Sequence, residues 1–232
     1  MTTFRSSIPV LYLCLASVIS AGCAGMPLAS WNPYYRNQWE HDEKIAPTYH
    51  AKIRDLVAIR SAAPQMTAAE QEDHSQKLLV IYREDRNTQI AAHAIAALAE
   101  FPTAASLEGL RLAVEHADQE VRMAGCRGWG RKQSPEALDT LARILGSDSD
   151  LDVRLAAADE LKAYRDPKAL QALGLVLGEN NPALQYRAIA SLKQNTGRDL
   201  GNNVDAWRQS LQDGNLAPAQ NENVVQKLRS WF

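Results

Sequence analysis

Few side chains of this chain have the spacing that metal chemistry requires. The five histidines stand at positions 41, 50, 74, 93 and 116. No two of them lie three or four residues apart, the spacing that would let a helix hold one metal ion between them. His41, Asp42 and Glu43 are adjacent, but consecutive side chains of a helix or strand point in different directions. We therefore predict no metal site.

The nucleophiles lack activating partners as well. No Ser occurs within Gly-x-Ser-x-Gly, the sharp turn that exposes a hydrolase nucleophile. Cys126 stands between Gly125 and Arg127 in a stretch typical of a packed helix, where a Cys behaves as a small hydrophobe. A neighbouring Arg can lower the pKa of a thiol, but the sequence pairs no His with Cys126. These features favour a non-enzymatic protein with no catalytic residue and no cofactor.

One glycine-rich segment raises the possibility of phosphate binding. Thr196–Gly201 reads "TGRDLG", and turns of this kind can present backbone N–H groups to an anion. The segment lacks the Gly-Lys-Ser/Thr arrangement of a Walker loop and follows a helical pattern. We interpret it as a turn between helices.

The charge balance gives no reason to expect a nucleic-acid partner. The 232 residues include 25 Lys and Arg against 27 Asp and Glu, a formal net charge of -2. A nucleic-acid-binding domain usually presents a strongly basic face. With 46% apolar residues, the chain has an ordinary globular composition.

The first 22 residues have the composition of a targeting segment. Arg5 precedes an apolar run at residues 8–19, and small residues follow it. The run has about a dozen residues, whereas a helix needs about 20 to span a bilayer. The pattern therefore predicts a secretory signal peptide over residues 1–22, excluded from the fold.

The end of that segment resembles the lipobox of bacterial lipoproteins. Ala21, Gly22 and Cys23 match the motif, while Ser20 stands where the motif usually has Leu. The resemblance implies that Cys23 carries acyl chains after cleavage, and Ala24 implies forwarding to the outer membrane, facing the periplasm. The alternative is ordinary cleavage after Ala21 or Ala24, with Cys23 incidental.

Residues 23–47 are predicted to be a polar, aromatic tether between the membrane and the folded part. The stretch is poorly periodic, yet a spacer is normally poor in aromatic residues. Its aromatic residues include Trp31, Tyr34, Tyr35 and Trp39. We expect them either to pack on the first repeat or to lie in the lipid interface, where Trp and Tyr are enriched.

Most of the remaining chain repeats with a period near 31. The stretches "QEVRMAGCRGWG" (119–130) and "LDVRLAAADELK" (151–162) share a Val-Arg pair and small residues. Aliphatic positions recur 31, 32 and 31 residues apart at Ile90, Val121, Val153 and Leu184. Within a segment the spacing is three and four, as in Leu138, Leu141 and Leu145, which places side chains on one helix face. Each repeat is predicted to be two helices.

These stretches resemble HEAT repeats, of the short bacterial type also called phycobilin-lyase HEAT-like. The shared block is Asp-x-x-Val-Arg-x-Ala-Ala, which is complete at residues 150–157 and has one Gly for Ala at residues 118–125. The resemblance covers roughly residues 76–212. It implies an all-α solenoid of about four to five helix pairs over residues 48–212, ended by a cap helix. Residues 213–232 are then a partly helical tail.

The resemblance also implies roles for the charged residues of the second helices. In HEAT repeats the Asp and Arg of this block bond across turns and between adjacent units. We interpret four residues first as such a structural ladder, and only second as ligand contacts: Asp118, Arg122, Asp150 and Arg154. Because second helices of HEAT units usually line the concave surface, three further residues are candidate partner-binding positions: Arg127, Asp159 and Lys162.

The expected function is that of a lipid-anchored, non-enzymatic scaffold or adaptor for an unidentified protein of the cell envelope. Two alternatives remain open. Some related repeats handle bilin chromophores, which implies a lyase-like protein that would need a Cys or His in a groove. A purely structural envelope lipoprotein is the other.

Overall fold

The structure is a computed structural model that describes residues 47–216. The chain divides into two units, Met1–Ala51 and Lys52–Phe232. Only residues 47–51 of the first unit are described, so the architecture below is that of the second unit. The predicted signal peptide, the proposed acylation site Cys23 and nearly all of the predicted tether lie outside the described residues.

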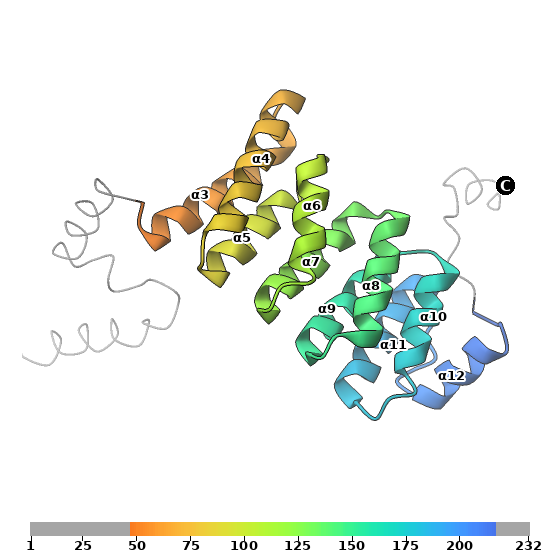
Figure 1. Cartoon of the computed structure of the whole chain (residues 1–232). Helices are drawn as coiled ribbons and strands as arrows, with labels where there is room; N and C mark the ends of the chain where they lie inside the picture. Colours follow the sequence, from red (N-terminus) through yellow and green to blue (C-terminus); the bar gives the residue numbers. More distant parts are fainter. Residues whose placement is uncertain (1–46, 217–232) are drawn as a thin grey trace, which may run out of the picture. The chain divides into compact units, whose positions relative to one another are not determined.

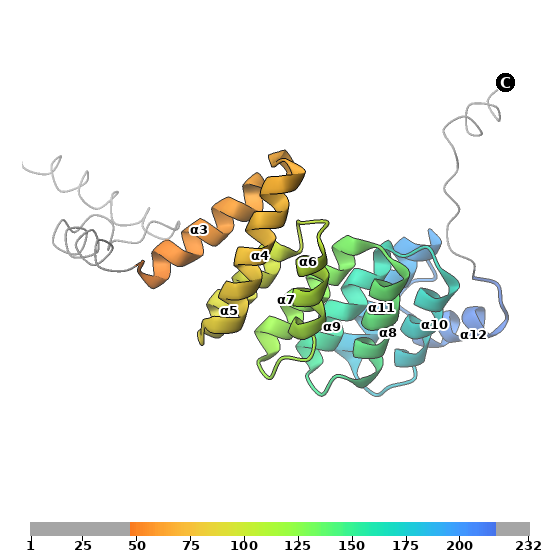
Figure 2. The same cartoon turned by 45° about the horizontal axis from the view of Figure 1, so that its top comes forward.

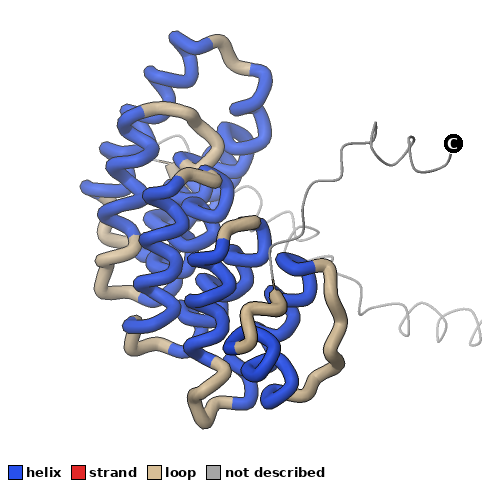
Figure 3. The backbone as a smooth tube through the Cα atoms, turned by 90° about the vertical axis from the view of Figure 1, so that its right-hand side faces the viewer, coloured by secondary structure: helices blue, strands red, loops and turns tan. Residues whose placement is uncertain are grey.

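The described residues contain ten α-helices, two short 3-10 helices and no strand. Each helix is joined to the next by a short connection (Figure 3). The elements are α3 (Tyr49–Ala62), η2 (Ala63–Gln65), α4 (Ala68–Glu84), α5 (Thr88–Leu98), α6 (Ala104–Ala113), α7 (Gln119–Lys132), α8 (Pro135–Ser147), α9 (Leu151–Glu160), η3 (Leu161–Ala163), α10 (Pro167–Val176), α11 (Pro182–Thr196) and α12 (Val204–Gln212). No described helix has the length and apolarity needed to cross a membrane.

From α4 onward the helices form two layers (Figures 1 and 2). Helices α5, α7, α9 and α11 pack side by side in what we call the odd layer. The even layer holds α4, α6, α8, α10 and α12, and each of the first four packs on the odd helix that follows it. Four stacked helix pairs and a terminal helix make an α-solenoid, which confirms the predicted fold class.

The recurring apolar positions form the core between the layers. Ile90, Val121, Val153 and Leu184 are at most 3% exposed. Eight residues further on, Leu98, Trp129, Leu161 and Leu192 are fully buried. No helix pair could bury these side chains alone, so the stacking of neighbours supplies the core.

Side-chain caps fix where the helices of the odd layer begin. The N-cap residue of each odd helix accepts a hydrogen bond from a backbone N–H of the first turn, which satisfies a donor that the helix leaves unpaired. These caps are Asn87, Asp118, Asp150 and Asn181. Short polar residues at a 31- to 32-residue spacing thus set the register of the repeats.

A turn with two left-handed glycines leads into the last helix. Gly197 and Gly201 have φ values of 69° and 70°, a region that favours glycine. The segment "TGRDLG" forms this turn, as the sequence predicted. Trp207 of α12 is fully buried, and its indole Nε1–H donates to the Gly201 carbonyl at 3.0 Å. The terminal helix is thereby fastened to its own connection.

Candidate functional site

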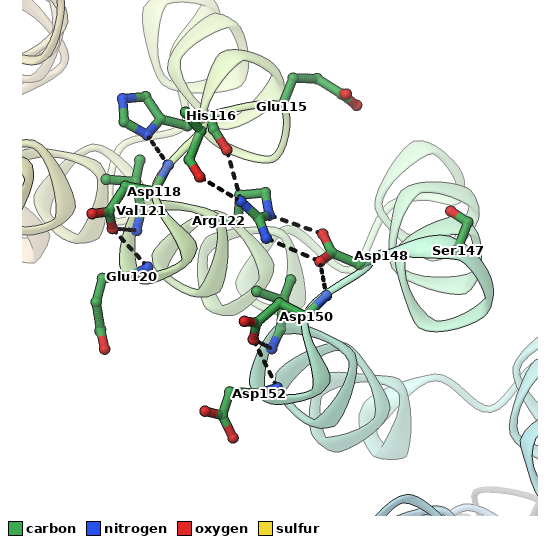
Figure 4. Close-up of polar contacts among 12 residues, drawn as sticks. Glu115, His116, Asp118, Glu120, Val121, Arg122, Ser147, Asp148, Asp150 and Asp152 are labelled. Carbon is green, nitrogen blue, oxygen red and sulfur yellow. Dashed lines mark hydrogen bonds and ion pairs between the residues drawn. The ribbon is translucent and has the colours of Figure 1, made fainter.

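Arg122 connects one repeat to the next (Figure 4). Its Nε and Nη2 atoms donate to the two carboxylate oxygens of Asp148 at 2.9 and 3.1 Å. Its Nη1 donates to the carbonyls of His116 and Ala117 at 3.0 and 2.9 Å. The paired side chains are only 14% and 10% exposed. A two-pronged, largely buried pair of this kind fixes the angle between two helix pairs.

Arg154 makes the equivalent contacts one repeat later. Its Nε donates to the Leu145 carbonyl at 2.7 Å, and its Nη2 binds Glu179 at 2.5 Å. At the other end of the second unit, Lys52 binds Asp85 at 2.8 Å. Three basic side chains therefore bind carboxylates that precede the helices of the odd layer.

Asp118 and Asp150 have a different role from the one that the resemblance implied. Each is an N-cap: Asp118 accepts from the Glu120 amide at 2.8 Å, and Asp150 accepts from the Asp152 amide at 2.9 Å. The carboxylate that binds Arg122 instead belongs to Asp148. The ladder therefore joins the arginines of the Asp-x-x-Val-Arg-x-Ala-Ala block to carboxylates just outside it, Asp148 and Glu179.

The ladder residues that the sequence analysis did not identify also recur at a fixed spacing. They stand two positions before each N-cap of the odd layer, 31, 32 and 31 residues apart: Asp85, His116, Asp148 and Glu179. In the first three of them a side-chain acceptor binds the N-cap amide at 2.9 to 3.0 Å. His116 stands where the other repeats have a carboxylate, and its Nδ1 accepts a hydrogen bond from the Asp118 amide. The position of the arginine that would bind a carboxylate there is taken by Ala91.

Two hollows on the exposed side of the odd layer share the side chain of Arg127. The first, of about 220 Å³, lies between α5 and α7. Its lining includes the small residues Ala92, Ala96, Ala124 and Gly128, with Arg60, His93, Glu120 and Arg131 around them. The second, of about 280 Å³, involves α7, α9 and α11, and carries Asp152, Asp159, Glu160 and Arg187.

The charges in the two hollows differ in sign. In the first, Arg60 and Arg131 both bind Glu100, and burial followed by the charge of Arg60 lowers the pKa of Arg131. In the second, burial and then the charge of Asp159 raise the pKa of Glu160. The first hollow is lined by three arginines and one glutamate, and the second by three carboxylates and two arginines, with Arg127 common to both.

The three candidate partner-binding residues come together at the second hollow. Arg127 and Asp159 both line it, and Lys162 of η3 binds Asp159 at 2.9 Å. Arg187 binds the other oxygen of Asp159 at 2.9 Å. Burial works to raise the pKa of Asp159, but the hydrogen bonds and charges of Lys162 and Arg187 outweigh it and lower that pKa.

Arg127 differs from the other arginines of this face because its guanidinium is exposed and unpaired. Among the described residues, no hydrogen bond or ion pair holds it. Its positive charge works to lower the pKa of Glu160. By contrast, Arg131 and Arg187 are both engaged in ion pairs. Arg127 is thus a cation available to another molecule.

Cys126 lies inside the core rather than in either hollow. Its side chain is fully buried, and burial raises the pKa of its thiol to about 12. Within residues 47–216, no group of three His, Cys, Asp or Glu side chains is placed to hold a metal ion.

Comparison with known proteins gives a family match and a remote likeness to solved structures. The family model described as HEAT repeats matches residues 75–150 and 107–193. No curated protein matches the chain. A similar solved structure is the complex of CpcE and CpcF of phycocyanin lyase from Nostoc sp. PCC7120, at 20% identity and a TM-score of 0.43, covering 68% of this chain and 98% of that one.

The structural likeness is too remote to carry an argument about activity, so the family rests on the sequence match. The two matched segments together extend from residue 75 to residue 193, more than half of the chain. They contain helices α5 to α10 and most of α11, together with the ion pairs that Arg122 and Arg154 make between repeats. The chain belongs to the HEAT-repeat family.

Proposed function

We propose that this chain is a non-enzymatic scaffold or adaptor that holds another protein on the exposed side of its odd layer. The observation that carries this proposal is the unpaired, exposed guanidinium of Arg127 between two hollows. Arginine is enriched among the residues that dominate binding at protein interfaces. Its planar group can bind a partner carboxylate through two parallel hydrogen bonds.

The shape of the first hollow supports a protein segment as the ligand. Its small, half-buried lining residues, such as Ala92 and Ala96, let a helix or an extended strand approach the backbone of α5. A partner with an acidic side chain near Arg127 and a basic one near Asp152 would match the charges of both hollows. The partner is thus expected to carry both signs of charge along one segment.

We further propose that acyl chains on Cys23 hold the solenoid at the cell envelope, at the outer membrane and facing the periplasm. The apolar run followed by Ala-Gly-Cys supports this location. Acyl chains bind a bilayer at roughly 0.8 kcal/mol per buried CH₂. In a Gram-negative host the wild type should fractionate with the outer membrane, and the Cys23→Ala variant should not. Equal fractionation of the two would refute acylation at Cys23.

Photo-cross-linking in intact cells tests the binding face. A photoreactive amino acid at Glu120, which lines the first hollow, should capture one dominant envelope protein. The same group at Leu112, which is 42% exposed on α6 of the even layer, is the matched control and should not capture it. Capture of that protein from Leu112 but not from Glu120 would show that the wrong face was assigned.

A further inference from the structure

An apolar groove of about 480 Å³ lies between α10 and α12, away from both hollows of the odd layer. Its apolar lining comes from both helices and from the chain that follows them. The residues concerned are Pro167, Leu170, Gly174, Leu175, Leu211 and Leu216. At Gly174 the two helices approach so closely that a Cβ there would lie 2.8 Å from Leu211 Cδ1.

Leu175 is left exposed at this groove. Its exposed fraction is 73%, more than that of any other large apolar side chain in residues 47–216. Burying a Leu side chain contributes about 1.5–3 kcal/mol. A leucine this exposed, next to an open apolar groove at the end of a solenoid, indicates a surface that another segment covers.

The chain itself leads a candidate segment to this place. Leu216, the last described residue, is 8% exposed and lines the groove. The described part of the chain therefore ends at the groove. Pro218 stands two residues after Leu216, and a proline disfavours helix at the residue before it. The chain can turn there instead of continuing in one direction.

The sequence beyond this turn has one apolar face at helical spacing. At about 100° per residue, five side chains fall in a stripe about 120° wide: Val224, Val225, Leu228, Trp231 and Phe232. The other side carries polar residues such as Gln226 and Arg229. As a helix, residues 224–232 would be about 14 Å long. The connection at residues 217–223 can extend over about 23 Å, enough for the helix to return along the groove.

We propose that residues 224–232 form an amphipathic helix that folds back into the α10–α12 groove of the same chain and covers Leu175. Because the segment is covalently attached beside the groove, its effective concentration there exceeds that of a separate partner. A solenoid needs a terminal element with a polar outer face, and this helix would supply it. The proposal concerns a different surface from the one assigned to the partner protein, so either can fail alone.

Hydrogen exchange measured by mass spectrometry on the purified full-length chain tests this proposal. The amides of residues 224–232 should exchange at least tenfold more slowly than an unstructured peptide of that sequence. Leu175→Asp should abolish this protection, and Leu112→Asp, the same change at an exposed leucine of α6, should leave it intact. Circular dichroism should show that both variants keep the helices, because both side chains are already exposed.

Three outcomes would overturn the proposal. The first is a segment that exchanges freely in the wild type. The second is protection that persists in Leu175→Asp, because the segment would then dock elsewhere. The third is protection that falls on dilution, because the occupant would then be a second copy of the chain. Leu228→Asp repeats the test from the side of the tail and should also abolish the protection.

Discussion

The guanidinium of Arg122 binds both carboxylate oxygens of Asp148, at 2.9 and 3.1 Å. The arginine belongs to α7 and the aspartate to the turn before α9, so the pair joins consecutive repeats. Both side chains are largely buried. Removing one partner of a buried ion pair leaves a charge without compensation, which costs far more than losing an exposed pair.

Arg122→Met should therefore lower the free energy of unfolding by about 3 kcal/mol. The matched control is Arg143→Met, which breaks the exposed pair between Arg143 and Glu115 and should cost at most about 0.5 kcal/mol. Urea denaturation followed by circular dichroism measures both. Equal losses in the two variants would show that the buried pair does not fasten the repeats.

Two glycine substitutions should shift stability in opposite directions. A Cβ at Gly125 of α7 would lie 2.9 Å from Val114 Cγ1 and 3.2 Å from the Val114 backbone nitrogen. Overpacking of this kind costs about 1–3 kcal/mol and outweighs the helix propensity of alanine. At Gly146 of α8 nothing lies within 4 Å of the new Cβ, so Gly146→Ala should stabilise by about 0.5–1 kcal/mol. Thermal melting that ranks Gly125→Ala above Gly146→Ala would contradict the packing described for α7.

The stability contributed by Lys132 should rise with pH. Its Nζ donates to the Phe101 carbonyl at 2.6 Å, and burial, followed by the charge of Arg131, lowers its pKa to about 8. Between that value and the ordinary 10.5, the unfolded chain binds the proton that the folded chain has lost, so folding is favoured as pH rises through this window. Because the side chain is half-buried, screening reduces the gain to about 1 kcal/mol.

The comparison of wild type with Lys132→Met between pH 7 and pH 10 isolates this contribution. Cys126 acts in the opposite direction above pH 9, because its pKa is raised in the folded state, but it is present in both proteins. The wild type should gain stability relative to the variant. A constant difference across the range would show that Lys132 keeps an ordinary pKa.

The Cys126 thiol should be inert in the folded protein. Burial and a pKa of about 12 keep it protonated and out of contact with reagents. Mass-spectrometric mapping after treatment with an alkylating reagent at pH 8 should find Cys126 unmodified until urea is added. Incubation with a bilin should likewise give no coloured adduct at this residue. Rapid alkylation, or a covalent adduct, would favour the chromophore-handling alternative.

The helices and their register could be predicted from the sequence because the repeat makes each signal appear several times. Val121 and Val153 stand at equivalent positions, and both are buried. A single apolar residue would have indicated little, but recurrence at 31 and 32 residues distinguishes a structural position from chance. The same recurrence identified the block that places Arg122 and Arg154 at the start of the odd helices.

The partners of these arginines could not be predicted with the same ease. Asp148 and Glu179 lie outside the recognised block and differ in side-chain length, and His116 fills the same place in a third repeat. The unpaired state of Arg127 is also a property of three-dimensional packing. It depends on where Asp159 finds its own partners, Lys162 and Arg187, which come from different segments.

The affinity of the protein captured at Glu120 for two charge-reversal variants tests whether Arg127 anchors a partner. Arg127→Glu should weaken binding at least tenfold, about 1.4 kcal/mol, because the anchoring cation becomes a like charge facing the partner carboxylate. Arg86→Glu makes the same change at an exposed arginine outside both hollows, and should alter the Kd less than twofold. Wild-type affinity in Arg127→Glu, or an equal loss in both variants, would contradict a binding face centred on Arg127.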